Sequence, residues 1–237
     1  MKKGLIQKVI FLTILCTVLC VILATVASCV DTSNKNPVVT IELDPSSKSQ
    51  IGGTIQIELF PDKAPNSVNY FIGLVLDGFY NDFYVTKVMA GHLVEFGDPW
   101  YLKKNDRVIA GEFAENGYTG NDVDFVRGTV GLALDTDREG NLDNDSAMGD
   151  FFVVLSDEAG DSYTGKRVAI GQIISGLEIL EEISRIKNHV NYQPLYSART
   201  ETVTLDLKGQ TYPKAITTKR KHYSGYVTDD FINDTEE

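Results

Sequence analysis

Apolar and polar positions alternate in short segments from Val38 to Leu207, and turn-forming residues separate them. In Gly53-Thr54-Ile55-Gln56-Ile57-Glu58-Leu59-Phe60, every second residue is aliphatic, which is the pattern of a half-buried strand. The other segments have the length and the β-branched or aromatic content of strands. The strands predicted in this way span residues 38–43, 53–60, 84–89, 93–96, 129–134, 151–155, 168–174 and 202–207.

Two segments change to helical spacing. Pro65 suits the first turn of a helix, a stripe of apolar residues runs from Val68 to Val75, and Gly78 fits the C-terminal stop. A second helix is predicted over residues 177–186, with Leu177 and Leu180 on its buried face. Many short strands with two separated helices predict a mainly β fold, either a barrel or a sandwich, capped by helices.

The first 28 residues have the character of a leader. Three lysines precede an uncharged apolar run over residues 9–27. The run ends in Val26-Ala27-Ser28-Cys29, which resembles the lipobox of bacterial lipoproteins and implies that cleavage leaves Cys29 lipidated. The alternative is an uncleaved transmembrane anchor, because the run is nearly long enough to span a bilayer. Both interpretations predict an extracytoplasmic bacterial protein held at a membrane.

The remaining length fits one medium domain. We predict a tether over residues 29–37, a single domain over residues 38–207, and a polar, loosely ordered C-terminal extension over residues 208–237.

Cysteine usage and charge exclude several classes of function. All three cysteines, Cys16, Cys20 and Cys29, lie in the leader or at its end, so the domain can contain neither a disulfide nor a cysteine-based metal site. The net charge is −11, and loss of the three leader lysines would leave 19 basic against 33 acidic residues. So acidic a surface argues against nucleic acid as a partner.

Five segments, in this order, resemble the cyclophilin family of peptidyl-prolyl cis-trans isomerases. The resemblance spans about residues 38–207 and implies a closed eight-stranded antiparallel β-barrel capped by two helices, a monomer that acts on proline-containing polypeptides. The segments are residues 53–80, Gly97-Asp98-Pro99, Arg127-Gly128-Thr129-Val130, Phe151-Phe152-Val153-Val154 and residues 165–171.

Isomerisation of an X-Pro bond needs no nucleophile, metal or cofactor. Amide resonance sets a rotation barrier of about 18–20 kcal/mol, so the enzyme needs an apolar pocket for the proline ring and a fixed donor that stabilises the twisted amide. In cyclophilins that donor is an arginine.

The resemblance carries the catalytic arginine onto Lys87, a Phe-Met pair of the pocket onto His92 and Leu93, and a pocket glutamine onto Glu95. Lys87 keeps the charge but lacks the planar fork of a guanidinium. Glu95 is close enough in sequence to pair with Lys87, which would support stability and reduce catalysis. The alternative for Lys87 is a plain solvated lysine on a strand.

The other pocket wall is mixed. Among the positions of the family's pocket, only Ala133 and Phe152 keep the family's residue. The resemblance implies that substrate also contacts Leu134, Asp150, Tyr163 and Arg167.

Oxygen-bearing side chains recur in the acidic segment over residues 135–146. Asp135, Asp137, Glu139 and Asp143 fall at positions one, three, five and nine, with Gly140 at position six. This spacing gives most of a calcium loop of the EF-hand kind, but Ser146 stands where the bidentate glutamate would be. A solvated acidic loop is the alternative, and calcium is the one ion that the sequence suggests.

Three functional hypotheses follow, of which a calcium-dependent adhesion or sensor domain built around the acidic loop is the third. The first is a peptidyl-prolyl isomerase acting on exported proteins, with activity attenuated by the altered site. The second is a non-catalytic cyclophilin-like module that binds peptides or a partner at the cell surface, with calcium as a possible regulator. Fold alone cannot decide between them.

Overall fold

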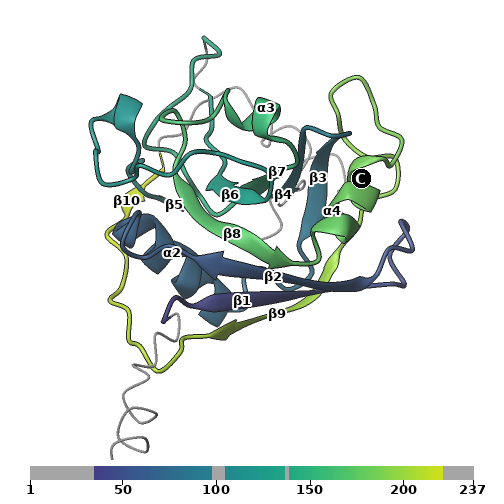
Figure 1. Cartoon of the computed structure of the whole chain (residues 1–237), viewed down its shortest axis with the longest axis horizontal. Coiled ribbons are helices and arrows are strands. Elements are labelled where there is room, and N and C mark those ends of the chain that lie inside the picture. Colours follow the sequence, from purple (N-terminus) through teal and green to yellow (C-terminus); the bar gives the residue numbers. More distant parts are fainter. Residues whose placement is uncertain (1–34, 98–104, 137–138, 221–237) are drawn as a thin grey trace, which may run out of the picture. The chain divides into compact units, whose positions relative to one another are not determined.

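The computed structural model describes residues 35–97, 105–136 and 139–220 (Figure 1). The predicted leader and Cys29 lie outside the described residues, so the lipobox interpretation stays a prediction. Within the described ranges, no helix has the length and hydropathy required to cross a bilayer.

Eight strands form one curled antiparallel sheet in the order β3-β4-β7-β6-β8-β2-β1-β9. Each corresponds to a strand predicted from the alternation, with ends shifted by two residues at most, so the mainly β fold is confirmed. The strands are β1 (Val38–Leu43), β2 (Gly53–Leu59), β3 (Tyr84–Met89), β4 (Leu93–Gly97), β6 (Thr129–Leu132), β7 (Phe151–Val154), β8 (Ala169–Ser175) and β9 (Thr200–Asp206).

The two edge strands of the sheet, β3 and β9, meet at a short seam. An isolated bridge pairs Tyr84 with Arg199. Beside it, the Val85 N–H donates to Ala198 O at 2.9 Å and the Thr200 N–H donates to Phe83 O at 2.8 Å. The ladder itself stays open between these strands, and full closure of the barrel remains a prediction.

The inner face of the sheet encloses the main hydrophobic core. Phe96 and Phe151 stack there with ring centroids 4.8 Å apart, and Phe71 meets Phe151 edge-on at 5.5 Å. Phe71 comes from helix α2 (Pro65–Leu76), which contacts β9, whereas helix α4 (Leu177–Ser184) contacts β2, β3 and β4 (Figure 1). The core therefore joins strands and helices from the whole described domain.

Helix α2 receives its N-terminal cap from another part of the chain. Its N-cap residue, Ala64, has no side-chain oxygen. Instead, the buried Glu112 carboxylate accepts from the N–H groups of Asn66 at 3.0 Å and Ser67 at 2.7 Å. These donors would otherwise be unsatisfied at a helix start.

The helix prediction was incomplete. Helix α4 ends at Ser184, two residues before the predicted end. The described part also contains α3 (Asp157–Gly160) and a 3₁₀ turn, η1 (Ala114–Asn116), each too short to produce a readable period.

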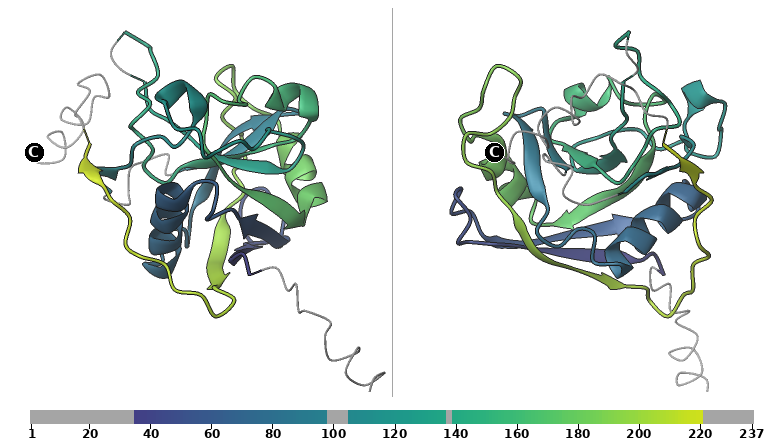
Figure 2. Two further views of the ribbon diagram at one scale, coloured as in Figure 1. Left: turned by 60° about the vertical axis from the view of Figure 1, so that its left-hand side comes forward. Right: turned by 180° about the vertical axis from the view of Figure 1, so that it is seen from behind.

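The expectation of loose order after residue 207 was wrong for residues 208–220. This segment runs along the outside of α2 and forms β10 (Thr218–Lys219), which pairs with β5 (Arg107–Val108) (Figures 1 and 2). The Asn66 side-chain amide both donates to Ile216 O at 3.0 Å and accepts from its N–H at 2.7 Å. Paired backbone groups thus fix a segment whose polar composition carries no periodic signal.

Candidate active site

One row of residues crosses four strands on the outer face of the sheet. Lys87 on β3 lies opposite Glu95 on β4, Glu95 lies opposite Phe152 on β7, and Phe152 lies opposite Gly131 on β6. Directly paired residues in antiparallel strands point to the same face. The register therefore brings a cation, a carboxylate and an aromatic ring to one surface.

Three aromatic rings gather at the Phe152 end of this row. Phe152 lies nearly parallel to Phe125, with centroids 5.7 Å apart, and the Tyr163 ring lies 4.9 Å from Phe152 and 6.0 Å from Phe125. Together with Val154, Ala159 and Ala169, these rings form a second hydrophobic cluster, separate from the main core. We call Phe125, Phe152 and Tyr163 the aromatic face.

Gly131 makes room for the aromatic face. A Cβ at this position would lie 2.7 Å from Phe152 Cζ and 2.8 Å from Phe125 Cε1, closer than carbon atoms can approach without displacement. The absence of a side chain on β6 therefore lets both rings lie against the strand.

At the other end of the row, Lys87 and Glu95 form an ion pair. Lys87 Nζ lies 3.3 Å from Glu95 Oε2, with 39% of the lysine side chain and 19% of the glutamate side chain exposed. The predicted pairing is confirmed. The Lys87 ammonium is thus occupied by an internal carboxylate.

His92 and Arg167 flank Tyr163. The Tyr163 hydroxyl lies 3.4 Å from His92 Nε2. Burial raises the pKa of Tyr163, the Arg167 charge opposes that rise and the Glu95 charge adds to it. The pKa of Arg167 is lowered, first by its own partial burial, and its Nη1 donates to Lys166 O at 2.7 Å. Tyr163 therefore lies between a cationic and an anionic group.

The sequence of the chain matches a known protein family. The sequence profile described as "Cyclophilin type peptidyl-prolyl cis-trans isomerase/CLD" matches residues 40–205. The chain belongs to the cyclophilin-type peptidyl-prolyl isomerase family.

Individual proteins similar to this chain are also named as peptidyl-prolyl isomerases. The chain is 29% identical to peptidyl-prolyl cis-trans isomerase 10 of Caenorhabditis elegans, over 65% of this chain and 89% of that protein. It is 28% identical to a probable peptidyl-prolyl cis-trans isomerase of Brucella suis, over 56% of this chain and 67% of that protein. The crystal structure of a Cryptosporidium parvum cyclophilin type isomerase superposes with a TM-score of 0.56 at 18% identity, covering 75% of this chain and 99% of that one, which supports the fold.

The cyclophilin-type positions predicted from sequence do not all reach the aromatic face. Leu134 packs against the main core, and Leu93 is buried on β4. The Asp150 backbone carbonyl accepts from the Ala133 N–H at 2.8 Å. Asp150 Oδ2 would lie 2.7 Å from a Cβ on Gly97, so its side chain is directed to that part of β4. The roles in substrate binding of these four residues stay predictions.

Phe125 is the member of the aromatic face that sequence reasoning missed. It lies in a polar segment with no strand or helix period, Gly120-Asn121-Asp122-Val123-Asp124-Phe125. A lone phenylalanine in such a segment was the available signal, because a large ring outside a periodic element usually packs against something.

The acidic loop does not form a recognisable metal centre where it is described. Asp135 Oδ2 accepts from Arg220 Nη2 at 2.6 Å, and Asp137 lies outside the described residues. Across residues 35–97, 105–136 and 139–220, no group of three or more histidine, cysteine or acidic residues could hold a metal. Calcium binding by Asp135, Asp137, Glu139 and Asp143 stays a prediction.

Proposed function

We propose that this protein is a peptidyl-prolyl cis-trans isomerase acting on X-Pro bonds of exported polypeptides, with turnover attenuated by its own ion pair. One observation carries the proposal: the strand register puts Lys87 on the same face as Phe152 and the other aromatic rings. The rings offer an apolar surface for the proline ring, and the ammonium offers a donor for the carbonyl of the twisting amide.

The attenuation follows from competition for the ammonium. Glu95 accepts from Lys87 at 3.3 Å, so the substrate carbonyl must displace a carboxylate that carries a full charge. An ammonium is also a point charge, whereas the guanidinium in other members of the family can hold two acceptors at once. Both effects weaken stabilisation of the transition state relative to the ground state.

The test is a protease-coupled proline isomerisation assay on the protein and three variants. Glu95→Gln should raise kcat/KM by about three- to tenfold, equivalent to roughly 1 kcal/mol of barrier, because the ammonium is released. Lys87→Arg combined with Glu95→Gln should raise it further. The matched control is Asp206→Asn, which removes the exposed pair with Lys208 at 2.7 Å and should leave the rate unchanged.

A second candidate is a non-catalytic module that binds proline-containing peptides. The occupied ammonium of Lys87 favours it, because a binding surface requires no free donor. A rate equal to the uncatalysed rate in the wild type and in every variant, with measurable peptide binding, would reject the enzyme and support this module.

We also place the protein outside the cytoplasm, attached to a bacterial membrane through lipidated Cys29. The lipobox-like Val26-Ala27-Ser28-Cys29 after an apolar run supports this proposal. Incorporation of labelled palmitate in a bacterial host, lost in Cys29→Ala, is the expected result, and labelling that survives the substitution would contradict it.

A further inference from the structure

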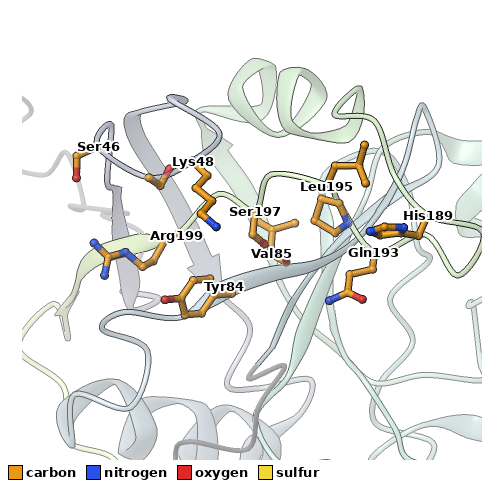
Figure 3. A pocket seen from close by; sticks show the side chains of 11 residues that line it. Ser46, Lys48, Tyr84, Val85, His189, Gln193, Leu195, Ser197 and Arg199 are labelled. Atoms are coloured by element: carbon orange, nitrogen blue, oxygen red, sulfur yellow. Dashed lines mark hydrogen bonds between the residues drawn. The ribbon is translucent and has the colours of Figure 1, made fainter.

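A cavity of about 500 Å³ opens at the seam between the two edge strands of the sheet (Figure 3). Its walls come from residues 46–48, which connect β1 and β2, from the start of β3, and from the segment between α4 and β9. None of the residues on the aromatic face lines it. We call it the seam cavity.

The wall on the β1 side is fixed by ion pairs. Arg199 donates from Nη2 to Asp44 and lies 2.9 Å, through Nη1, from Asp82 Oδ1. Asp44 also accepts from the Ser46 N–H at 2.7 Å. Because two carboxylates hold Arg199, its guanidinium is already engaged within the wall.

The wall on the α4 side is fixed to the edge of β3. The Val88 N–H donates to Tyr192 O at 2.9 Å, and the Asn188 side chain donates to Val88 O at 2.7 Å. The Val85 N–H bonds to Ala198 O further along. The seam cavity lies between these attachment points. Because the hydrogen bonds already fix this wall, little conformational entropy is lost when a ligand binds.

Three polar side chains on the seam cavity have no partner. Lys48, His189 and Gln193 line it, and among the described residues their side chains form no hydrogen bond or ion pair. Figure 3 shows the Lys48 side chain reaching from its loop toward Tyr84 and Ser197. The seam cavity therefore has a lysine ammonium that no described carboxylate pairs with, beside two further polar side chains.

The opposite side is apolar and continues onto the surface. Pro194 and Leu195 line the seam cavity there, and Leu195 is 42% exposed. Three more apolar or aromatic side chains of the same segment are exposed, Val190 fully, Tyr196 to 57% and Tyr192 to 46%. These side chains give the segment beside the seam cavity an apolar character that a partner's apolar side chain can contact.

We propose that the seam cavity is a second polypeptide-binding site, which takes a segment carrying a carboxylate next to an apolar side chain. The carboxylate pairs with the Lys48 ammonium, and the apolar side chain packs on Leu195 and Pro194. The local charge supports this choice, because Lys48 lines the seam cavity and its ammonium pairs with no carboxylate of the described residues. The net charge of −11 disfavours an anionic membrane as the occupant, because a membrane would face many carboxylates of the surface at once.

The carboxylate of this proposal is that of an internal acidic residue, and a free chain terminus is an alternative that the experiment separates. Full-length ¹⁵N-labelled protein is titrated with three proline-free peptides and followed by NMR amide shifts: acetyl-Gly-Leu-Glu-Leu-Gly-amide, its Glu→Gln counterpart, and acetyl-Gly-Gly-Leu with a free terminus. We expect saturable shifts at residues 46–48 and 189–197 with the Glu peptide, whereas shifts with the free-terminus peptide alone would overturn the proposal. The Gln peptide should bind about two- to fivefold more weakly, because an exposed ion pair contributes up to about 1 kcal/mol.

Lys48→Gln should remove this difference between the peptides, whereas Lys187→Gln, a lysine that does not line the cavity, should leave it unchanged. The isomerisation rate of Lys48→Gln should equal that of the wild type, so this proposal and the proposed isomerase can fail separately. Equal affinities for the Glu and Gln peptides, or shifts that never saturate, would overturn the proposal. So would Lys48-dependent binding to phosphatidylglycerol vesicles without peptide binding, which would assign the surface to a membrane.

Discussion

The Lys87 ammonium lies 3.3 Å from Glu95 on a face that it shares with Phe152. With 39% of the lysine side chain exposed, such a pair contributes little to stability, since exposed ion pairs are worth about 0–1 kcal/mol. Under the proposed function its importance is chemical, because it determines whether the Lys87 ammonium is available as a donor beside the aromatic face.

Gly131 offers a direct test of the aromatic face. In Gly131→Ala the new Cβ would meet the rings of Phe152 and Phe125 at 2.7 and 2.8 Å, so both rings must move. We expect a loss of about 1–3 kcal/mol in the free energy of unfolding, typical of overpacking, with weaker binding of proline peptides. Urea unfolding and a peptide titration measure the two effects.

The control for this substitution is Gly73→Ala in helix α2, where an added Cβ meets nothing within 4 Å. It should stabilise the protein by up to about 1 kcal/mol, since alanine is the better helix former. A Gly131→Ala protein as stable as the wild type would show that the rings do not pack on β6.

Among the elements, helix α2 depends most clearly on a distant residue. Its start carries Pro65, which suits the first turn, but Ala64 cannot cap it. Glu112 supplies the acceptors for Asn66 and Ser67, and it also accepts from the Ser67 hydroxyl at 2.7 Å. The helix is therefore tied to the chain that precedes η1.

Removing this carboxylate in Glu112→Ala should lower the free energy of unfolding by about 1–3 kcal/mol, because buried N–H groups lose their acceptor. Hydrogen exchange should accelerate first at Asn66 and Ser67. Glu115→Ala, which changes an exposed glutamate of the same segment, should leave both measurements near the wild-type values. Unchanged exchange at the helix start would rule out Glu112 as the cap.

For the whole molecule, a charged network adds to the backbone hydrogen bonds at the seam between β3 and β9. Arg199 precedes β9, Asp44 follows β1 and Asp82 precedes β3, and the guanidinium pairs with both carboxylates. The network thus joins three parts of the chain at the place where the sheet ladder is interrupted. Its stability should depend on the ionisation of Asp44.

The pKa of Asp44 is lowered from 3.8 to about 2, first by the hydrogen bond from Arg199 and then by those from Ser46. A carboxyl with a depressed folded-state pKa stabilises the fold above its unfolded-state pKa and loses that effect as the pH falls through the folded-state value. Asp44→Asn should therefore be less stable than the wild type at about pH 6, and the difference should shrink between about pH 4 and about pH 2.

Urea unfolding across this pH range measures the effect. Asp161→Asn, which changes an exposed carboxylate that forms no ion pair with any described residue, is the control and should show no such convergence. A stability difference for Asp44→Asn that stays constant down to about pH 2 would contradict the assignment of the network to the seam.

Much of this protein followed from the sequence alone, because local side-chain periodicity is read directly from neighbouring residues. The alternation between Gly53 and Leu59 predicted β2, and the stripe after Pro65 predicted α2. The spacing of Lys87 and Glu95 across one short turn also predicted their ion pair. These features depend on contacts close in sequence.

Only the tertiary structure decided the features that depend on distant contacts. Phe125 joins Phe152 because two segments meet over Gly131, Glu112 caps a helix that begins 47 positions earlier at Pro65, and Asn66 fixes Ile216. The seam cavity likewise exists because Lys48 and His189 come from loops at opposite edges of the sheet. No local sequence pattern predicts these contacts, because the residues that form them become neighbours only after the sheet has curled.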